Sequence, residues 1–136
     1  MTYAVSAALQ EAVFGALAGD PAVTALVGAH IYDAVPAGDL PGLYVTLGPE
    51  TVTDASDKSG GGALHRITLL IHSDAPGFRS AKETAAAICD ALVDAALPLA
   101  RGRLIHLGFE RASATRRANG PERQIELRFR ARVEDS

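Results

Sequence analysis

The sequence predicts an α+β fold in which an antiparallel sheet of about four strands carries two main helices on one face. Apolar residues recur at steps of three and four over 3–18 and over 77–96, as on one side of a helix. Apolar and charged residues alternate over 123–133, as in a strand with one covered face. The order is helix, strands, helix and C-terminal hairpin, and the length suits one domain over 1–136.

The first third of the chain predicts a second, short helix and a short strand. The helix over 3–18 is followed by Asp20 and Pro21, a capping residue and a proline in the first helical position. We therefore expect a short helix over 21–27. The β-forming residues of 31–35 predict a short strand after it.

The middle of the chain predicts two strands with a long connection between them. The first strand covers 43–47 and continues weakly over 50–53, and the second covers 64–71. The residues between them, 54–62, are polar and rich in glycine. This composition predicts a mobile connection that is longer than a hairpin needs.

The C-terminal part predicts a long β-hairpin with a basic tip. Its strands cover 103–112 and 123–133, and the tip is the segment SATRRANGP at 113–121. In the second strand, the odd positions from 125 to 133 are apolar and the even positions are charged. One face of this hairpin is therefore expected to pack on the core, and the other to carry the charges.

The composition predicts a thin core and a subunit that depends on neighbours. The chain has 26 alanines and no tryptophan, so few side chains bury a large area. Residues 1–100 carry a formal charge of −7 and residues 101–136 carry +4. Such segregation is typical of a protein that associates with nucleic acid or with copies of itself. The alternative is that folding interleaves the two parts and cancels the field.

Several classes of protein have no support in the sequence. No apolar run has the length of a transmembrane helix, the start does not resemble a signal peptide, and Cys89 is the sole cysteine. We expect synthesis in a bacterial type of cytoplasm and Cys89 to be buried. The four histidines occur singly, and the glycines of 60–62 lack the lysine of a phosphate-binding loop. We therefore expect no enzyme activity, no cofactor and no metal.

The arginine-rich hairpin is the remaining signal. Phe109 and Phe129 fall in the apolar phase of their strands, so they cannot stack on bases between the arginines. Arginine also suits paired hydrogen bonds with carboxylates at protein interfaces. We therefore favour contacts between subunits over a solvated face or a nucleic-acid site. The interface candidates are Arg116, Arg117, Asn119, Arg128, Arg130 and Arg132, with Asp54, Asp57 and Lys58 in the glycine-rich connection.

Several segments resemble a known family over about residues 3 to 134. They are VGAHIYDAVP at 27–36, YVTLG at 44–48, DASDK at 54–58 and RFRARVED at 128–135. With them, the chain resembles the tail-completion or tail-terminator proteins of long-tailed phages, in particular the version in gene transfer agents of the Rhodobacter type.

This resemblance implies a structural protein without enzyme activity or cofactor. It implies a ring of about six copies at the head-proximal end of the tail tube, which ends tube polymerisation and binds the head-completion or stopper protein. DNA would pass through the lumen without being read, no membrane would be involved, and the ring would leave the cell in a phage-like particle. The alternatives are the neighbouring head-completion ring and a nucleic-acid-binding module that uses the C-terminal hairpin.

Overall fold

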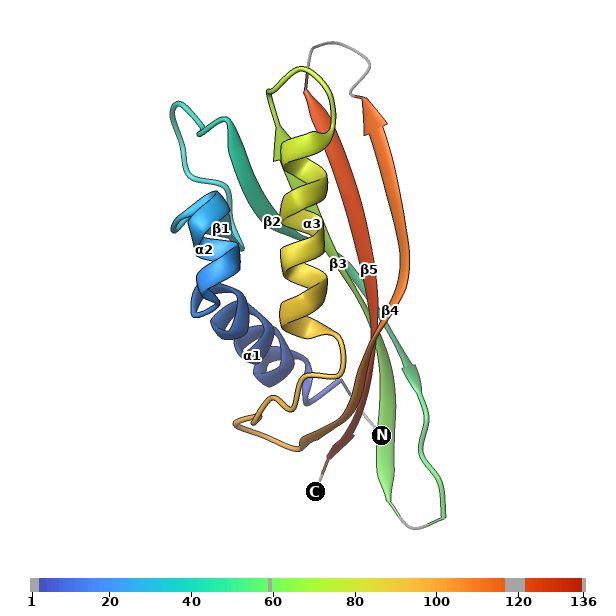
Figure 1. Ribbon diagram of the computed structural model, residues 1–136. Coiled ribbons are helices and arrows are strands. Elements are labelled where there is room, and N and C mark those ends of the chain that lie inside the picture. The colour runs from blue at the N-terminus through green and yellow to red at the C-terminus, as the bar shows by residue number, and fades with distance from the viewer. Residues whose placement is uncertain (1–2, 59, 117–121, 136) are drawn as a thin grey trace.

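Three helices cover one face of a five-stranded sheet in the computed structural model, which describes residues 3–58, 60–116 and 122–135 (Figure 1). The α+β prediction is confirmed. The elements are α1 (Ser6–Ala18), α2 (Pro21–Val27), β1 (Ile31–Tyr32), β2 (Leu43–Asp54), β3 (Gly61–Ser73), α3 (Arg79–Leu92), β4 (Arg103–Arg116) and β5 (Arg123–Asp135).

The strands lie in the order β1-β2-β3-β5-β4. The short strand β1 runs parallel to β2, and the other neighbours are antiparallel. The last strand of the sequence, β5, therefore lies inside the sheet between β3 and β4. The predicted four strands are the four long ones, and the predicted short strand pairs only through Ile31 and Tyr32.

Several predicted boundaries are wrong. The strand predicted over 103–112 continues to Arg116, because residues 113–116 pair with β5, so the first four residues of the predicted tip belong to β4. The helix predicted to reach residue 96 ends at Leu92, because Val93 is extended and Asp94 has a φ of 59°. The Asp94 N–H instead donates to the Leu107 carbonyl oxygen of β4. The connection predicted over 54–62 is also shorter, because β2 reaches Asp54 and β3 begins at Gly61.

The core lies between the helices and the side of the sheet that they cover. In β5, the side chains of Leu127, Phe129 and Val133 are buried there, as the alternating pattern predicts. Leu9 of α1 and Ile88 of α3 are fully buried in the same core. The remaining fully buried side chains of this layer are mostly leucine, valine and alanine, which agrees with the thin core expected from the composition.

The half-buried carboxylate of Glu50 joins the N-terminal segment to the sheet. Glu50 follows an irregularity in the pairing of β2 with β3, and its Oε1 accepts hydrogen bonds from Tyr3 Oη (2.6 Å) and Ser6 Oγ (2.8 Å). Nδ1 of the fully buried His65 lies 3.1 Å from Glu50 Oε2. Burial alone would raise the pKa of Glu50, but the hydrogen bonds from Tyr3, His65 and Ser6 outweigh it and hold that pKa below its usual value.

Candidate protein-interaction surface

The face of the sheet away from the helices carries the charged residues of the C-terminal hairpin (Figure 1). On β5, the even positions lie on this open face, while Phe129 and its odd-numbered neighbours face the core. Arg130 lies opposite Arg66 of β3 and opposite Gly108 of β4, and Arg128 lies opposite Arg111 of β4. The arginines predicted to share a strand face therefore do so, and Arg66 and Arg111 extend the set across three strands.

Some of these arginines are paired within the sheet. The Nε of Arg66 donates to Glu110 Oε1 over 3.0 Å, and Arg128 Nε lies 4.0 Å from Glu110 Oε2. Arg128 also lies 3.7 Å from the Glu126 carboxylate. These pairs hold Arg128, which is half-buried, against the sheet. Because its charge is already matched, Arg128 contributes less to an outside partner than an unpaired arginine would.

Arg130 and Arg132 extend further toward solvent. Arg132 is exposed, and its Nη2 donates to the Ala55 carbonyl oxygen over 3.2 Å. Arg130 is exposed, and it has neither a hydrogen bond nor an ion pair with any of the residues described. Among the predicted arginines of β5, Arg130 and Arg132 therefore carry charges that no carboxylate of the described residues matches, and Arg130 is the more weakly held of the two because it lacks the hydrogen bond of Arg132.

Two ion pairs at the end of the hairpin contribute little to this surface. Arg101 donates to both carboxylate oxygens of Asp135, and Arg103 donates to Glu134. The hydrogen bonds from Arg101 lower the pKa of Asp135, and those to Asp135 raise the pKa of Arg101. These side chains lie at the surface, where water screens the charges, so each pair stabilises the fold only weakly.

The helix layer has the opposite charge. Residues 3–42 and 74–100, which form the helices and their connections, carry eight acidic and two basic side chains. The open face of β3, β4 and β5 carries six arginines and three glutamates: Arg66, Arg103, Arg111, Arg128, Arg130 and Arg132, with Glu110, Glu126 and Glu134. Folding therefore separates most of the charge, because the helix layer is net acidic and the open face of the sheet is net basic. Arg116 and Arg123 of the hairpin are exceptions, since they lie on the helix-covered side.

The turn between β2 and β3 satisfies its own polar groups. Asp54 Oδ1 accepts a hydrogen bond from Ser56 Oγ over 2.6 Å, which lowers the pKa of Asp54. Asp57 Oδ1 accepts from the Gly60 N–H over 3.0 Å. Lys58 is exposed and extends from the same turn. The structure thus brings the three candidates of this connection together at one end of the sheet.

The candidates at the hairpin tip lie at the other end of the sheet. Arg116 is the last residue of β4, and it is exposed and opposite Arg123 in the register. Arg117 and Asn119 lie outside the residues that the structure describes.

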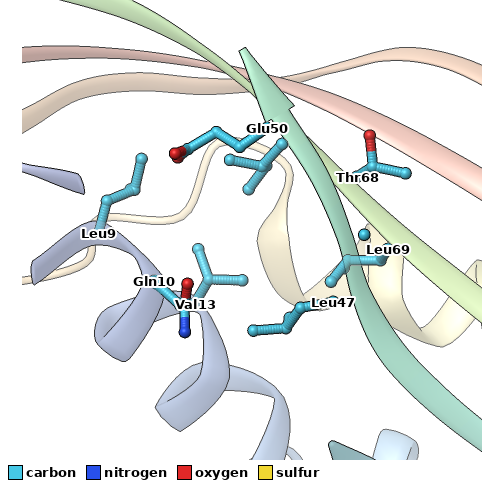
Figure 2. A pocket seen from close by; sticks show the side chains of 9 residues that line it. Leu9, Gln10, Val13, Leu47, Glu50, Thr68 and Leu69 are labelled. Carbon is cyan, nitrogen blue, oxygen red and sulfur yellow. The ribbon is translucent and has the colours of Figure 1, made fainter. Parts of the chain in front are cut away.

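The best-enclosed cavity among the described residues is small. A cavity of about 40 Å³ lies between α1 and β2, and Figure 2 shows that Leu9, Val13 and Leu47 surround it. Substrate pockets are about 300 Å³ or larger, so this cavity suits a water molecule or two. No group of three metal-binding side chains is found within the described ranges, and none of the helices there is long and apolar enough to cross a membrane.

Cys89 differs from its prediction, because it is only half-buried. Its burial, helped by the charge of nearby Asp90, raises the pKa of the thiol. A raised pKa leaves little of the reactive thiolate at neutral pH.

The sequence pattern did not predict that Phe109 would be exposed at the surface. It lies on the helix-covered side of β4, as its apolar phase predicts, and its ring meets the edge of Phe129 at 6.1 Å between centroids. It is nevertheless 47% exposed, because α3 lies over β3 and β5 and leaves β4 at the edge uncovered (Figure 1). The sequence pattern shows which face a residue occupies, and it does not show how far the helices extend across that face.

Two comparisons with known proteins agree. The family model described as "Tail completion protein gp17" matches residues 11–134. A solved chain from the "Virion of native gene transfer agent (GTA) particle" is 55% identical, with a TM-score of 0.93, over 98% of this chain and 99% of that one. Among curated proteins, none matches the chain significantly.

Proposed function

This chain belongs to the family of tail completion proteins gp17, and from that premise we propose that it is a structural subunit that completes the tail of a phage-like gene transfer particle. In this proposal, six copies form a ring at the head-proximal end of the tail tube. The ring ends polymerisation of the tube and joins it to the head-completion or stopper protein, while DNA passes through its lumen.

The observation that carries the proposal is the separation of charge between the two layers. Eight acidic and two basic side chains lie in the helix layer, and six arginines and three glutamates lie on the open face of the sheet. A closed ring is built from heterologous contacts, in which one surface of a subunit meets a different surface of the next. Opposite charges on two sides of one subunit favour that head-to-tail arrangement and disfavour the symmetric one.

The two ends of the sheet suit two different partners. The turn with Asp54, Asp57 and Lys58 lies at one end, and the described ends of β4 and β5, Arg116 and Arg123, lie at the other (Figure 1). The thirteen residues of β3 span about 40 Å between these ends at roughly 3.3 Å per residue. In a ring, one end would contact the tail tube and the other would contact the stopper protein.

The nucleic-acid-binding alternative has less support. The aromatic residues of the C-terminal hairpin, Phe109 and Phe129, lie on the side away from Arg128, Arg130 and Arg132, so the open face has no base-stacking platform beside those arginines. Arg66 and Arg128 are already paired with Glu110. A ring through which DNA only passes also benefits from few phosphate contacts, since dense contacts would retain the DNA.

The test is to reverse the unpaired charge and image the particles. We expect particles made with Arg130→Glu as the sole copy to show tails of irregular length or tails that lack heads. Arg79→Glu makes the same charge change at an exposed site of the helix layer, and it should leave tails uniform and joined. Arg130→Glu particles that are indistinguishable from those of the unmodified chain would contradict the charged-face contact.

A binding measurement separates the nucleic-acid alternative. Purified unmodified chain should bind duplex DNA weakly at low salt. Tight binding that falls steeply with added salt, and that Arg130→Glu abolishes, would favour that alternative over the ring.

A further inference from the structure

One strip of the sheet's helix-covered side lacks a helix. After the pairing irregularity between Phe109 and Arg111, the side chains of Ala112, Ala114 and Arg116 lie on the same side of β4 as Phe109. Ala112 and Ala114 are not buried, although they lie opposite the buried Leu127 and Ile125 of β5. We call the strip formed by Phe109, Ala112 and Ala114 the β4 shelf.

At the β4 shelf the helix layer of the subunit is incomplete. Over the central part of β2, β3 and β5, helices cover the apolar side of the strands (Figure 1). The small side chains of Ala112 and Ala114 would let another helix approach closely, and Phe109 offers a large apolar contact. Exposed apolar surface beside a packed core is typical of a site that a partner covers.

The free backbone edge of β4 is a poorer docking site than the shelf. Its pairing with β5 is irregular between Leu104 and His106 and again between Phe109 and Arg111. Such irregularities break an edge into short stretches and disfavour the addition of another strand. A partner on β4 is therefore expected to pack onto the side chains of the shelf and not to extend the sheet.

The charges around the shelf are basic. Arg116 continues the shelf toward the tip. Arg123, opposite it on β5, lies 5.5 Å from the centre of the Phe78 ring, and Lys82 Nζ of α3 lies 5.8 Å from the same ring. The side of α3 that lies next to the shelf therefore also carries a cation, Lys82. An apolar partner with acidic flanks would fit this strip.

The α1 side of the molecule has the complementary chemistry. Phe14 on α1 is 36% exposed, and Glu11, three residues earlier, is exposed on the same side of the helix. Residues 1–57 contain seven acidic side chains and no lysine or arginine. In Figure 1, α1 lies on the opposite side of the molecule from β4, so a subunit cannot place its own α1 on its own shelf.

We propose that the β4 shelf receives α1 of a second copy of this chain, so that each subunit completes the helix layer of its neighbour. Phe14 of one copy packs on Phe109 and the alanines of the next, and Glu11 faces Arg116. This assignment rests on the proposed ring and adds to it a second contact between neighbouring copies, beside the one that the open-face arginines make. Because the two surfaces differ, the contact is heterologous and repeats from copy to copy until the ring closes.

Cysteine cross-linking tests the contact directly. In a Cys89→Ser background, Gly15→Cys places a thiol on the exposed side of α1, where a Cβ has open space, and Ala112→Cys places one on the shelf. Under oxidation, we expect this pair to give a ladder of covalent oligomers. Gly60→Cys with Ala112→Cys is the matched control, because Gly60 is exposed in the turn between β2 and β3, where a Cβ also has open space. It should give no ladder.

The outcomes separate this inference from the proposed function. Rings visible by electron microscopy without a ladder, or equal cross-linking of the control pair, would overturn the β4 shelf as the contact and leave the ring intact. Dimers formed by Ala112→Cys alone would show that the shelf meets itself, which also overturns the proposal. Completed particles that contain no ring of this chain would overturn the proposed function itself.

Charge reversal gives a second, independent readout. Glu11→Lys and Arg116→Glu should each raise the concentration at which rings dissociate, by about tenfold. The double variant should recover part of that loss. Failure of the double variant to recover any of it would show that these two charges do not meet.

Discussion

Substitution of Glu50 is the strongest test of how the N-terminal segment is held on the sheet. Glu50→Gln keeps the size of the side chain and removes its charge. Oε1 can still accept from Tyr3 and Ser6, as it does in the native chain. The amide nitrogen, however, then faces Nδ1 of His65, where Oε2 now accepts.

The size of the expected loss in the free energy of unfolding follows from His65. This residue is fully buried, and its Nε2 has no hydrogen-bond partner among the described residues. The native arrangement therefore places the imidazole proton on Nδ1, where Glu50 accepts it. In the Glu50→Gln variant, either two N–H groups face each other or the proton moves to Nε2 and is left unpaired. One unsatisfied buried donor costs about 1–3 kcal/mol, so we expect the free energy of unfolding to fall by that amount.

Urea unfolding at several pH values is the assay. The folded-state pKa of Glu50 lies below its usual value of 4.5, so the carboxylate stabilises the fold above the unfolded-state pKa. That contribution is lost as the pH falls through the folded-state pKa. The difference in the free energy of unfolding between the native chain and Glu50→Gln should therefore be largest near neutral pH and decrease in acid. A difference below about 0.5 kcal/mol at neutral pH, or one that does not change in acid, would refute the reasoning.

Two further substitutions test the packing, with thermal or urea unfolding as the measurement. Phe129→Ala empties a fully buried site and removes the edge contact with Phe109, so it should lower the free energy of unfolding by about 3–5 kcal/mol. Phe129→Leu should lower it clearly less. Similar losses for the two variants would contradict tight packing at this site. Gly102→Ala should destabilise by more than about 1 kcal/mol, because Gly102 has a φ of 71° and a Cβ would lie 2.4 Å from the Glu134 carbonyl oxygen; unchanged stability would show that this turn can shift.

The sequence was sufficient for features that depend on local periodicity. The alternation in β5 showed which residues face the core, and the apolar stripe of α3 located the main helix. These predictions succeed because a strand repeats every two residues and a helix every 3.6.

Features that depend on distant partners could not be predicted. The helix α3 ends early because Asp94 bonds to β4, where its side chain also meets His106 at 3.0 Å. The pairing of Arg66 with Glu110 joins residues 44 positions apart. The exposure of Phe109 depends on the lateral position of α3 over the sheet. Each of these requires the order of the strands, which periodicity does not contain.

The position of β5 ties the two parts of the sheet together. This strand fills the slot between β3 and β4, so without it β4 would have no pairing with the rest of the sheet. Removal of β5 would take away Phe129 of the core and the arginines of the open face in one step. The packing of the core and the charge of the open face therefore depend on the same strand.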